Sequence, residues 1–266
     1  MSNLQKTARR MVLLRHIPGF QAWNRLFFKR EHPALARDAF GIVFPHPVGL
    51  APVLDRQEEL LDGCDSLGYS FTGIIPNDIG TVAARLSNRK SGIIAYVELK
   101  ADDRTEEQVR RHIVRTYSLL YDFADFFVVD INRQDGLNSM DDISDWKDIL
   151  DELLELRLCY ERYKPILLRI SPDQPADLMH RILDFSLLSG IDGVIAPGVS
   201  LVREVFRYTK GRLPVIGAGA ITSPQDAAAL LDAGAVLVEV AQGIPFHCRS
   251  TARRILQALD NPSSKK

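Results

Sequence analysis

The sequence predicts an α/β fold: a single (β/α)8 barrel of the TIM type with a short N-terminal helical arm. The chain has 266 residues, close to the roughly 250 residues typical of such a barrel. From Phe44 onward, short apolar runs rich in β-branched residues alternate with helix-length segments, which is the pattern of parallel βαβ units. Eight such runs can be counted. Eight strands with helices between them form a closed barrel more naturally than an open sheet.

The apolar runs are the expected strands, and the segments between them are the expected helices. The strands are expected at Val48–Ala51, Phe71–Ile75, Ile93–Glu98, Phe126–Asp130, Ile166–Ile170, Gly193–Ala196, Val215–Gly217 and Val236–Val240. The helices are expected at Arg104–Tyr121, Ser144–Glu161, Pro175–Ser189, Leu201–Lys210, Pro224–Ala233 and, closing the barrel, Ile244–Leu259. Proline, serine, aspartate or threonine stands near several of the helix starts, as is typical of helix N-termini. The barrel is therefore assigned to residues 32–260, with its active-site residues just after the strands.

The two ends of the chain fall outside this pattern. Residues 1–31 are expected to form the helical arm, in which a basic and aromatic amphipathic stretch covers residues 9–30 and is interrupted at Pro18-Gly19. Packing on the barrel or on another subunit explains its apolar stripe better than an anionic membrane surface does, although peripheral membrane contact is the alternative. Residues 261–266 are expected to be a flexible tail.

Composition excludes several classes of function. A formal net charge of −1 provides no long-range field to attract nucleic acid, so no nucleic-acid partner is expected. Three widely separated cysteines and six histidines without ligand spacing indicate neither a disulfide framework nor a metal site. No apolar window is long enough to span a membrane. These features favour a cytoplasmic protein, with possible contact at the inner face of the membrane as the alternative, and they leave the oligomeric state undetermined.

Two small-residue turns near the C-terminus predict a phosphate site. Residues 213–223 and 233–244 each contain an apolar strand that runs into a turn of small residues opening a helix. Without bulky side chains, backbone N–H groups and two helix dipoles can converge on a dianion. The alternative is a pair of ordinary βα turns whose small residues serve only helix packing, because Gly-x-Gly alone is a weak signal.

The order of motifs along the chain resembles the membrane-associated, class 2 dihydroorotate dehydrogenases. The resemblance begins at residues 32–56, around Phe44-Pro45-His46-Pro47-Val48-Gly49-Leu50-Ala51. It continues through Gly68-Tyr69-Ser70-Phe71, residues 125–131, Pro165-Ile166-Leu167-Leu168-Arg169-Ile170-Ser171-Pro172-Asp173, residues 192–196, Gly217-Ala218-Gly219-Ala220-Ile221 and Gln242-Gly243. It therefore spans residues 32–258 in the family's order.

This resemblance implies an FMN barrel and a link to pyrimidine biosynthesis. The residues that it assigns to the flavin phosphate are Gly219, Ala220, Gln242 and Gly243. It places the isoalloxazine ring against Ala51 and Pro52, and Arg169 beneath the flavin where the family has lysine. Arginine keeps the positive charge but has a different shape and hydrogen-bond geometry.

The substrate motifs depart from the family. Arg133 stands where the family has the serine that takes the proton from dihydroorotate, and a guanidinium cannot accept a proton. The family's Asn-Thr-Thr is replaced at residues 197–200, and its asparagine-rich segment has no counterpart near residues 87–92. The sequence therefore predicts poor or absent turnover of dihydroorotate.

Other charged residues could take over the lost roles. Asp130 and Asp135 are candidate bases, with Arg169 a third candidate catalytic residue, and Arg56 and Arg133 are candidates for binding an anionic small-molecule substrate. A salt-bridged loop that closes a disused pocket is an equally good interpretation of Asp130, Arg133 and Asp135.

Three functions remain open at this point. The first is an FMN-dependent oxidoreductase of uncertain substrate, and the second is a catalytically inactive barrel that binds a phosphorylated ligand or a protein partner. The third is a barrel without flavin that acts on a sugar phosphate through Glu98, Lys100 or Glu239.

Overall fold

The computed structural model describes residues 33–52, 61–101, 105–131, 143–241 and 248–260 of the chain, which form a closed parallel barrel. Going around it, the strand order is β10, β3, β4, β5, β6, β7, β8, β9, and every pair of neighbours is parallel. The strands are β3 (Val48–Leu50), β4 (Phe71–Ile74), β5 (Ile94–Lys100), β6 (Phe126–Asp130), β7 (Ile166–Arg169), β8 (Gly193–Pro197), β9 (Val215–Gly219) and β10 (Leu237–Val240). The predicted (β/α)8 fold and all eight expected strands are confirmed.

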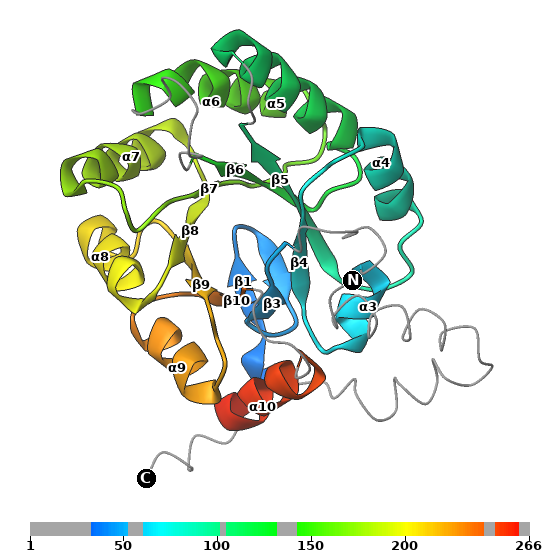
Figure 1. Cartoon of the computed structure of the whole chain (residues 1–266), viewed down its shortest axis with the longest axis vertical. Helices are drawn as coiled ribbons and strands as arrows, with labels where there is room; N and C mark the ends of the chain where they lie inside the picture. The colour runs from blue at the N-terminus through cyan, green and yellow to red at the C-terminus, as the bar shows by residue number, and fades with distance from the viewer. Residues whose placement is uncertain (1–32, 53–60, 102–104, 132–142, 242–247, 261–266) are drawn as a thin grey trace.

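Helices surround the barrel on its outside (Figure 1). They are α3 (Leu61–Ser66), α4 (Ile79–Ser87), α5 (Glu106–Leu120), α6 (Ile143–Leu158), α7 (Ala176–Ser189), α8 (Val199–Thr209), α9 (Pro224–Asp232) and α10 (Cys248–Asp260). The sequence analysis did not assign α3 and α4. The segment Pro76-Asn77-Asp78 leads into α4, where the Asp78 carboxylate accepts the backbone N–H of Thr81 at 2.7 Å as an N-cap. The expected arm at residues 1–31 and the tail lie outside the described residues.

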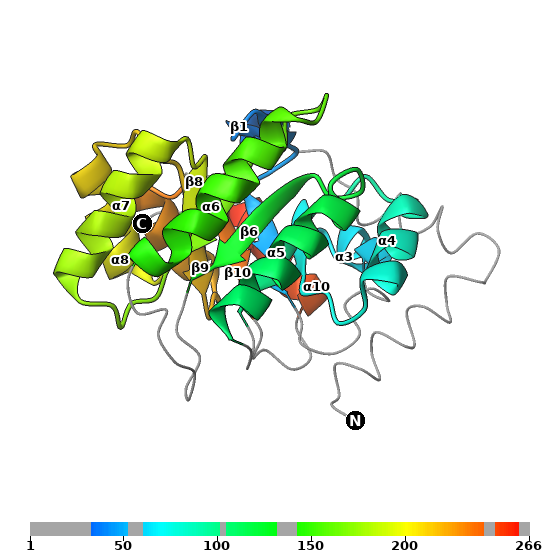
Figure 2. The same ribbon diagram turned by 90° about the horizontal axis from the view of Figure 1, so that it is seen from above.

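An antiparallel hairpin that the sequence analysis missed lies at one end of the barrel (Figure 2). It consists of β1 (Arg37–Ala39) and β2 (Ile42–Phe44), joined by Phe40 and Gly41 at φ +56° and +74°. Positive φ at both central residues is typical of a type I′ turn. Strands of three residues carry too little periodicity to be recognised in a sequence.

This hairpin closes the N-terminal end of the barrel with aromatic rings. Phe44 is fully buried, with its ring centroid 5.4 Å from that of Phe71 and 6.3 Å from that of Phe126. Gly49 and Gly73 leave room for the interior rings, because a Cβ atom at either position would lie 2.3 Å from Phe71 or Tyr96. The N-terminal half of the barrel interior is thus filled by apolar and aromatic side chains.

Two arginine–aspartate pairs tie together the loops at the same N-terminal end. Arg89 donates to both oxygens of Asp125, at 2.6 and 2.9 Å, just before β6. Arg157, at the end of α6, donates to Asp192 at 2.8 Å, just before β8. In a β/α barrel, interactions at the N-terminal end contribute to stability rather than to chemistry.

Among the helices whose residues are described, none combines the length and apolar character that crossing a bilayer requires.

Candidate functional site

The C-terminal ends of β5, β6 and β7 carry three charged residues at one level of the barrel. Lys100 pairs in register with Asp130, and Asp130 pairs in register with Arg169. Strand β5 reaches Lys100, two residues beyond its expected end. Because side chains alternate along a strand, Tyr96, Glu98 and Lys100 share one face, and their contacts show that this face is the barrel interior.

Arg169 reaches across the barrel interior and binds side chains from two other strands. Its Nε donates to Glu98 Oε2 at 3.0 Å, and its Nη1 donates to Glu239 Oε1 at 3.1 Å. Its Nη2 donates to the Tyr96 hydroxyl at 2.9 Å and lies 2.8 Å from Glu98 Oε2. Glu98 is on β5 and Glu239 on β10. Arg169 therefore forms a charged layer directly above the apolar filling.

Tyr96 joins the two layers. Its hydroxyl donates to Glu239 Oε2 at 2.6 Å while its ring stacks on Phe126 with centroids 4.9 Å apart. Burial, together with the neighbouring Glu239 carboxylate, raises the Tyr96 pKa well above its ordinary value. The phenol therefore stays protonated and acts as a hydrogen-bond donor.

Lys100 and Asp130 form the outer part of the same cluster. The Lys100 Nζ lies 3.0 Å from Glu98 Oε1 and 3.0 Å from Asp130 Oδ2. Burial lowers the pKa of Lys100, but the two carboxylates outweigh burial and raise it above its ordinary value. Lys100 is therefore a permanent cation at neutral pH.

The described cluster contains more carboxylates than cations. Glu98, Asp130 and Glu239 face Lys100 and Arg169, so full ionisation would leave one negative charge in excess. Burial raises the pKa of Glu98 above its ordinary value, against the lowering influence of Arg169 and Lys100. Glu98 therefore accepts a proton at a higher pH than an ordinary glutamate does.

Two glycines leave open space at the ends of neighbouring strands. Among the described residues, a Cβ atom on Gly198, which follows β8, would meet nothing within 4 Å, and one on Gly219, which ends β9, would meet only the Gly198 nitrogen at 4.0 Å. Their φ angles are +78° and +155°. A third glycine differs, because a Cβ on Gly217 would lie 3.1 Å from Leu230 of α9. Helix packing therefore explains Gly217, whereas Gly198 and Gly219 border an open cradle.

Two backbone N–H groups just before α9 are already bound by a side chain of that helix. Asp226 accepts the backbone N–H groups of Thr222 and Ser223 at 2.9 and 2.8 Å. These bonds, led by that from Thr222, hold the pKa of the Asp226 carboxyl below its usual value. An anion at this end would therefore be met by the open Gly198–Gly219 side rather than by these two N–H groups.

The other predicted site residues divide into described and undescribed ones. Ala51 is buried at the end of β3 and donates its N–H to the Val240 carbonyl at 2.9 Å, and Pro52 follows it, half-buried. Ala220 is exposed beside Gly219. The residues that lie outside the described part of the chain are Arg56, Arg133, Asp135, Gln242 and Gly243.

The sequence analysis did not identify the cluster as a unit. Tyr96 was not singled out, and Glu98, Lys100 and Glu239 were considered only for a barrel without flavin. A usable signal was present, because Tyr96, Glu98 and Lys100 alternate with the apolar residues of β5. Within the described ranges, no group of histidine, cysteine, aspartate and glutamate side chains is placed to hold a metal ion.

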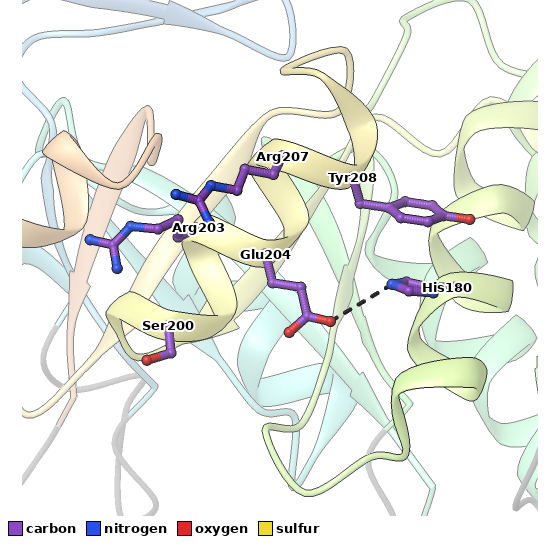
Figure 3. Close-up of a pocket in the computed structure, with 6 residues that line it drawn as sticks. All are labelled: His180, Ser200, Arg203, Glu204, Arg207 and Tyr208. Carbon is purple, nitrogen blue, oxygen red and sulfur yellow. Dashed lines mark ion pairs between the residues drawn. The ribbon is translucent and has the colours of Figure 1, made fainter.

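An open groove lies on the outside of the barrel between α7 and α8 (Figure 3). Its volume is about 550 Å³, and its lining residues are His180, Ser200, Arg203, Glu204, Arg207 and Tyr208. His180 stacks on Tyr208 with ring centroids 4.1 Å apart, and its Nε2 lies 3.8 Å from Glu204. His180 therefore packs against Tyr208 across the two helices. None of the predicted site residues lines this groove.

Comparison with known proteins points to one family. A sequence model described as dihydroorotate dehydrogenase matches residues 188–262. The chain is 25% identical to the dihydroorotate dehydrogenase (quinone) of Roseiflexus sp. strain RS-1, over 96% of this chain and 86% of the relative. It is 27% identical to the enzyme of the same name from Salinispora arenicola, over 96% and 92% of the two chains.

Solved structures agree on the fold. The dihydroorotate dehydrogenase of Eimeria tenella in complex with ferulenol matches with a TM-score of 0.78 at 19% identity, covering 89% of this chain and 87% of that one. A mandelate oxidase with a C4a-OH-FMN adduct matches with a TM-score of 0.58 at 15% identity, covering 85% and 77%.

Proposed function

Because the chain is a divergent member of the dihydroorotate dehydrogenase family, we propose that it binds FMN at the C-terminal end of its barrel and oxidises a small organic substrate. The observation that carries the proposal is the open cradle formed by Gly198 and Gly219, at adjacent strand ends. Backbone without Cβ atoms is what lets a phosphate approach main-chain N–H groups closely. The mandelate oxidase that shares this fold carries an FMN adduct, and this supports FMN as the ligand.

Different residues of this chain would bind the phosphate, contact the flavin ring and take up a proton. Gly219 and Ala220, with Gln242 and Gly243, would hold the phosphate, and Ala51 and Pro52 would lie against the ring. Bound FMN would supply the hydride-accepting chemistry. Asp130, at the rim, is the described carboxylate best placed to take a proton from a substrate, because it is buried yet lies at the end of its strand.

The proposed phosphate site is tested by placing larger side chains at Gly219 and Ala220. Ala220→Leu and Gly219→Leu should weaken FMN binding at least tenfold, measured by quenching of flavin fluorescence. Gly219→Leu also strains a backbone at φ +155°, so Ala220→Leu is the primary variant and thermal melts are recorded for both. Gly92→Leu is the matched control, because Gly92 is exposed and a Cβ there meets nothing within 4 Å. Unchanged FMN affinity in folded Ala220→Leu and Gly219→Leu would contradict the cradle.

We further propose that the substrate is not dihydroorotate. General-base catalysis typically contributes about 10²–10⁴-fold to a rate, and Arg133 occupies the family's base position in a form that cannot accept a proton. Flavin-loaded protein mixed anaerobically with dihydroorotate in a stopped-flow instrument should lose its flavin absorbance far more slowly than about 1 s⁻¹. Reduction at that rate or faster would contradict the proposal and identify Asp130 or Asp135 as a replacement base.

A second candidate function is a catalytically inactive barrel that binds a phosphorylated ligand or a protein partner. It is favoured by the closed ion network, in which Glu98 and Glu239 satisfy Arg169. The two functions differ in how reduced flavin behaves. Reoxidation by a quinone such as menadione at roughly 1 s⁻¹ or faster supports the oxidoreductase, and reoxidation no faster than that of free FMN supports the binding protein.

A further inference from the structure

The two cations of the cluster, Arg169 and Lys100, differ in how many of their N–H donors bind neighbouring side chains. All three guanidinium nitrogens of Arg169 are engaged, with Glu98, Glu239 and Tyr96. Two buried carboxylates therefore face one positive charge. A ligand above Arg169 would meet a cation whose charge is already neutralised by these two carboxylates and most of whose five N–H donors are engaged.

Lys100 is in a different position. Its side chain is 28% exposed, against 16% for Arg169 and 2% for Glu98, so it is the most exposed member of the cluster. An ammonium group has three N–H donors, and the contacts to Glu98 and Asp130 account for two of them. With respect to the described residues, one donor remains for a ligand at the mouth of the barrel.

The anchoring of Lys100 fixes where this donor can point. Glu98 and Asp130 hold the Nζ from neighbouring strands, each at 3.0 Å. A flexible four-carbon stem loses little further freedom when its head group is already held on two sides. Lys100 is thus a preorganised cation rather than a freely moving surface lysine.

We propose that Lys100, rather than Arg169, is the cation that faces the bound flavin and stabilises negative charge on its ring, while Arg169 is a structural member of the layer beneath. This inference rests on the proposed binding of FMN at this end of the barrel. It assigns to Lys100 the role that sequence resemblance assigns to Arg169. Asp130 would then also hold Lys100 in place for the flavin, in addition to its proposed role as the base toward the substrate.

Sulfite is the probe that separates the two cations. It adds reversibly to N5 of oxidised flavin, forming an N–S bond and leaving a negative charge on the ring, and the bleaching of the visible flavin band measures its dissociation constant. A neighbouring cation tightens this equilibrium. Lys100→Met should weaken sulfite binding by about tenfold or more, the scale of one hydrogen bond to a charged group, measured on the variant saturated with FMN. Lys100→Arg should retain most of the sulfite affinity.

The matched comparison neutralises one carboxylate beside each cation. Asp130→Asn removes a negative charge beside Lys100, and Glu239→Gln removes a negative charge beside Arg169. Asp130→Asn should tighten sulfite binding at least threefold and Glu239→Gln should change it less, so this pair decides the question even where Lys100→Met does not fold. Lys147→Met, on the exposed side of α6, should change nothing.

Three results would overturn the inference, and each is distinct from the others. A larger effect of Glu239→Gln than of Asp130→Asn would return the role to Arg169. Equal sulfite affinity in the parent and a folded Lys100→Met would remove Lys100 from contact with the ring. Absence of FMN binding in the folded parent would defeat the proposed function, and the assignment of Lys100 would fall with it.

Discussion

Both ends of this barrel carry ion pairs between basic and acidic side chains, but the ratio of cations to carboxylates differs between them. At the N-terminal end, each arginine has one aspartate: Arg89 pairs with Asp125 and Arg157 with Asp192. Each aspartate also accepts a backbone N–H near the start of a strand, from Ala95 or Ile166, both at 2.8 Å. The charges balance, and the pairs fix the loops that lead into the strands.

At the C-terminal end, each cation binds more than one carboxylate, and the carboxylates outnumber the cations. Arg169 divides its donors between Glu98 and Glu239, and Lys100 bridges Glu98 and Asp130. A single proton or a bound ligand can change the charge of such a cluster, whereas a balanced pair resists it. In β/α barrels in general the N-terminal end contributes to stability and the C-terminal end carries the ligand site, and the uneven cluster lies at the C-terminal end.

The largest expected effect is at the uneven end. Arg169→Met would leave Glu98 and Glu239 buried without their shared cation, and should lower the free energy of unfolding by about 3–5 kcal/mol, measured by urea denaturation at neutral pH. The double variant Arg169→Met/Glu239→Gln should lose less, because one stranded carboxylate is removed. A loss of less than about 1 kcal/mol in Arg169→Met would mean that the network does not support the barrel.

A smaller effect is expected at the balanced end. Asp192→Asn removes the charge that holds the buried Arg157 but keeps an oxygen for the Ile166 N–H, and should cost about 2–3 kcal/mol. Asp125→Asn should cost less, because Arg89 and Asp125 are more exposed. FMN affinity should be unchanged in both folded variants. Weakened FMN binding in either variant would break the separation between the two ends.

The smallest expected effect is a dependence on pH. Because the pKa of Glu98 is raised in the folded protein, the stability contributed by its protonated form is present below its ordinary pKa of 4.5 and is lost as the pH rises through the folded value. The groups that face Glu98 are Arg169, Lys100, Asp130 and Glu239. Glu98→Gln should therefore gain stability relative to the parent as the pH rises above 4.5, by at most about 1.4 kcal/mol per pH unit. Parallel stability curves for the parent and Glu98→Gln would contradict this shift.

The sequence predicted the barrel well because its strands are short, mostly apolar runs separated by segments of helix length. The hairpin at Arg37–Phe44 was missed because each of its strands has only three residues. The glycine turns were also predictable, but only the structure separates Gly217, which packs on α9, from Gly219, which borders open space. The pairing of Arg169 with Glu98 and Glu239 could not be predicted, because these residues lie on strands far apart in the chain and meet only when the barrel closes.

The central claim, that the C-terminal end of this barrel is an FMN site, is tested most directly by titrating the purified protein with FMN. The visible spectrum as purified and a calorimetric titration of the flavin-free protein together give the stoichiometry. The account predicts saturation at one FMN per chain, with a lower affinity in Ala220→Leu than in Gly92→Leu. A correctly folded protein that shows no flavin bands and binds no FMN at millimolar concentration would contradict it.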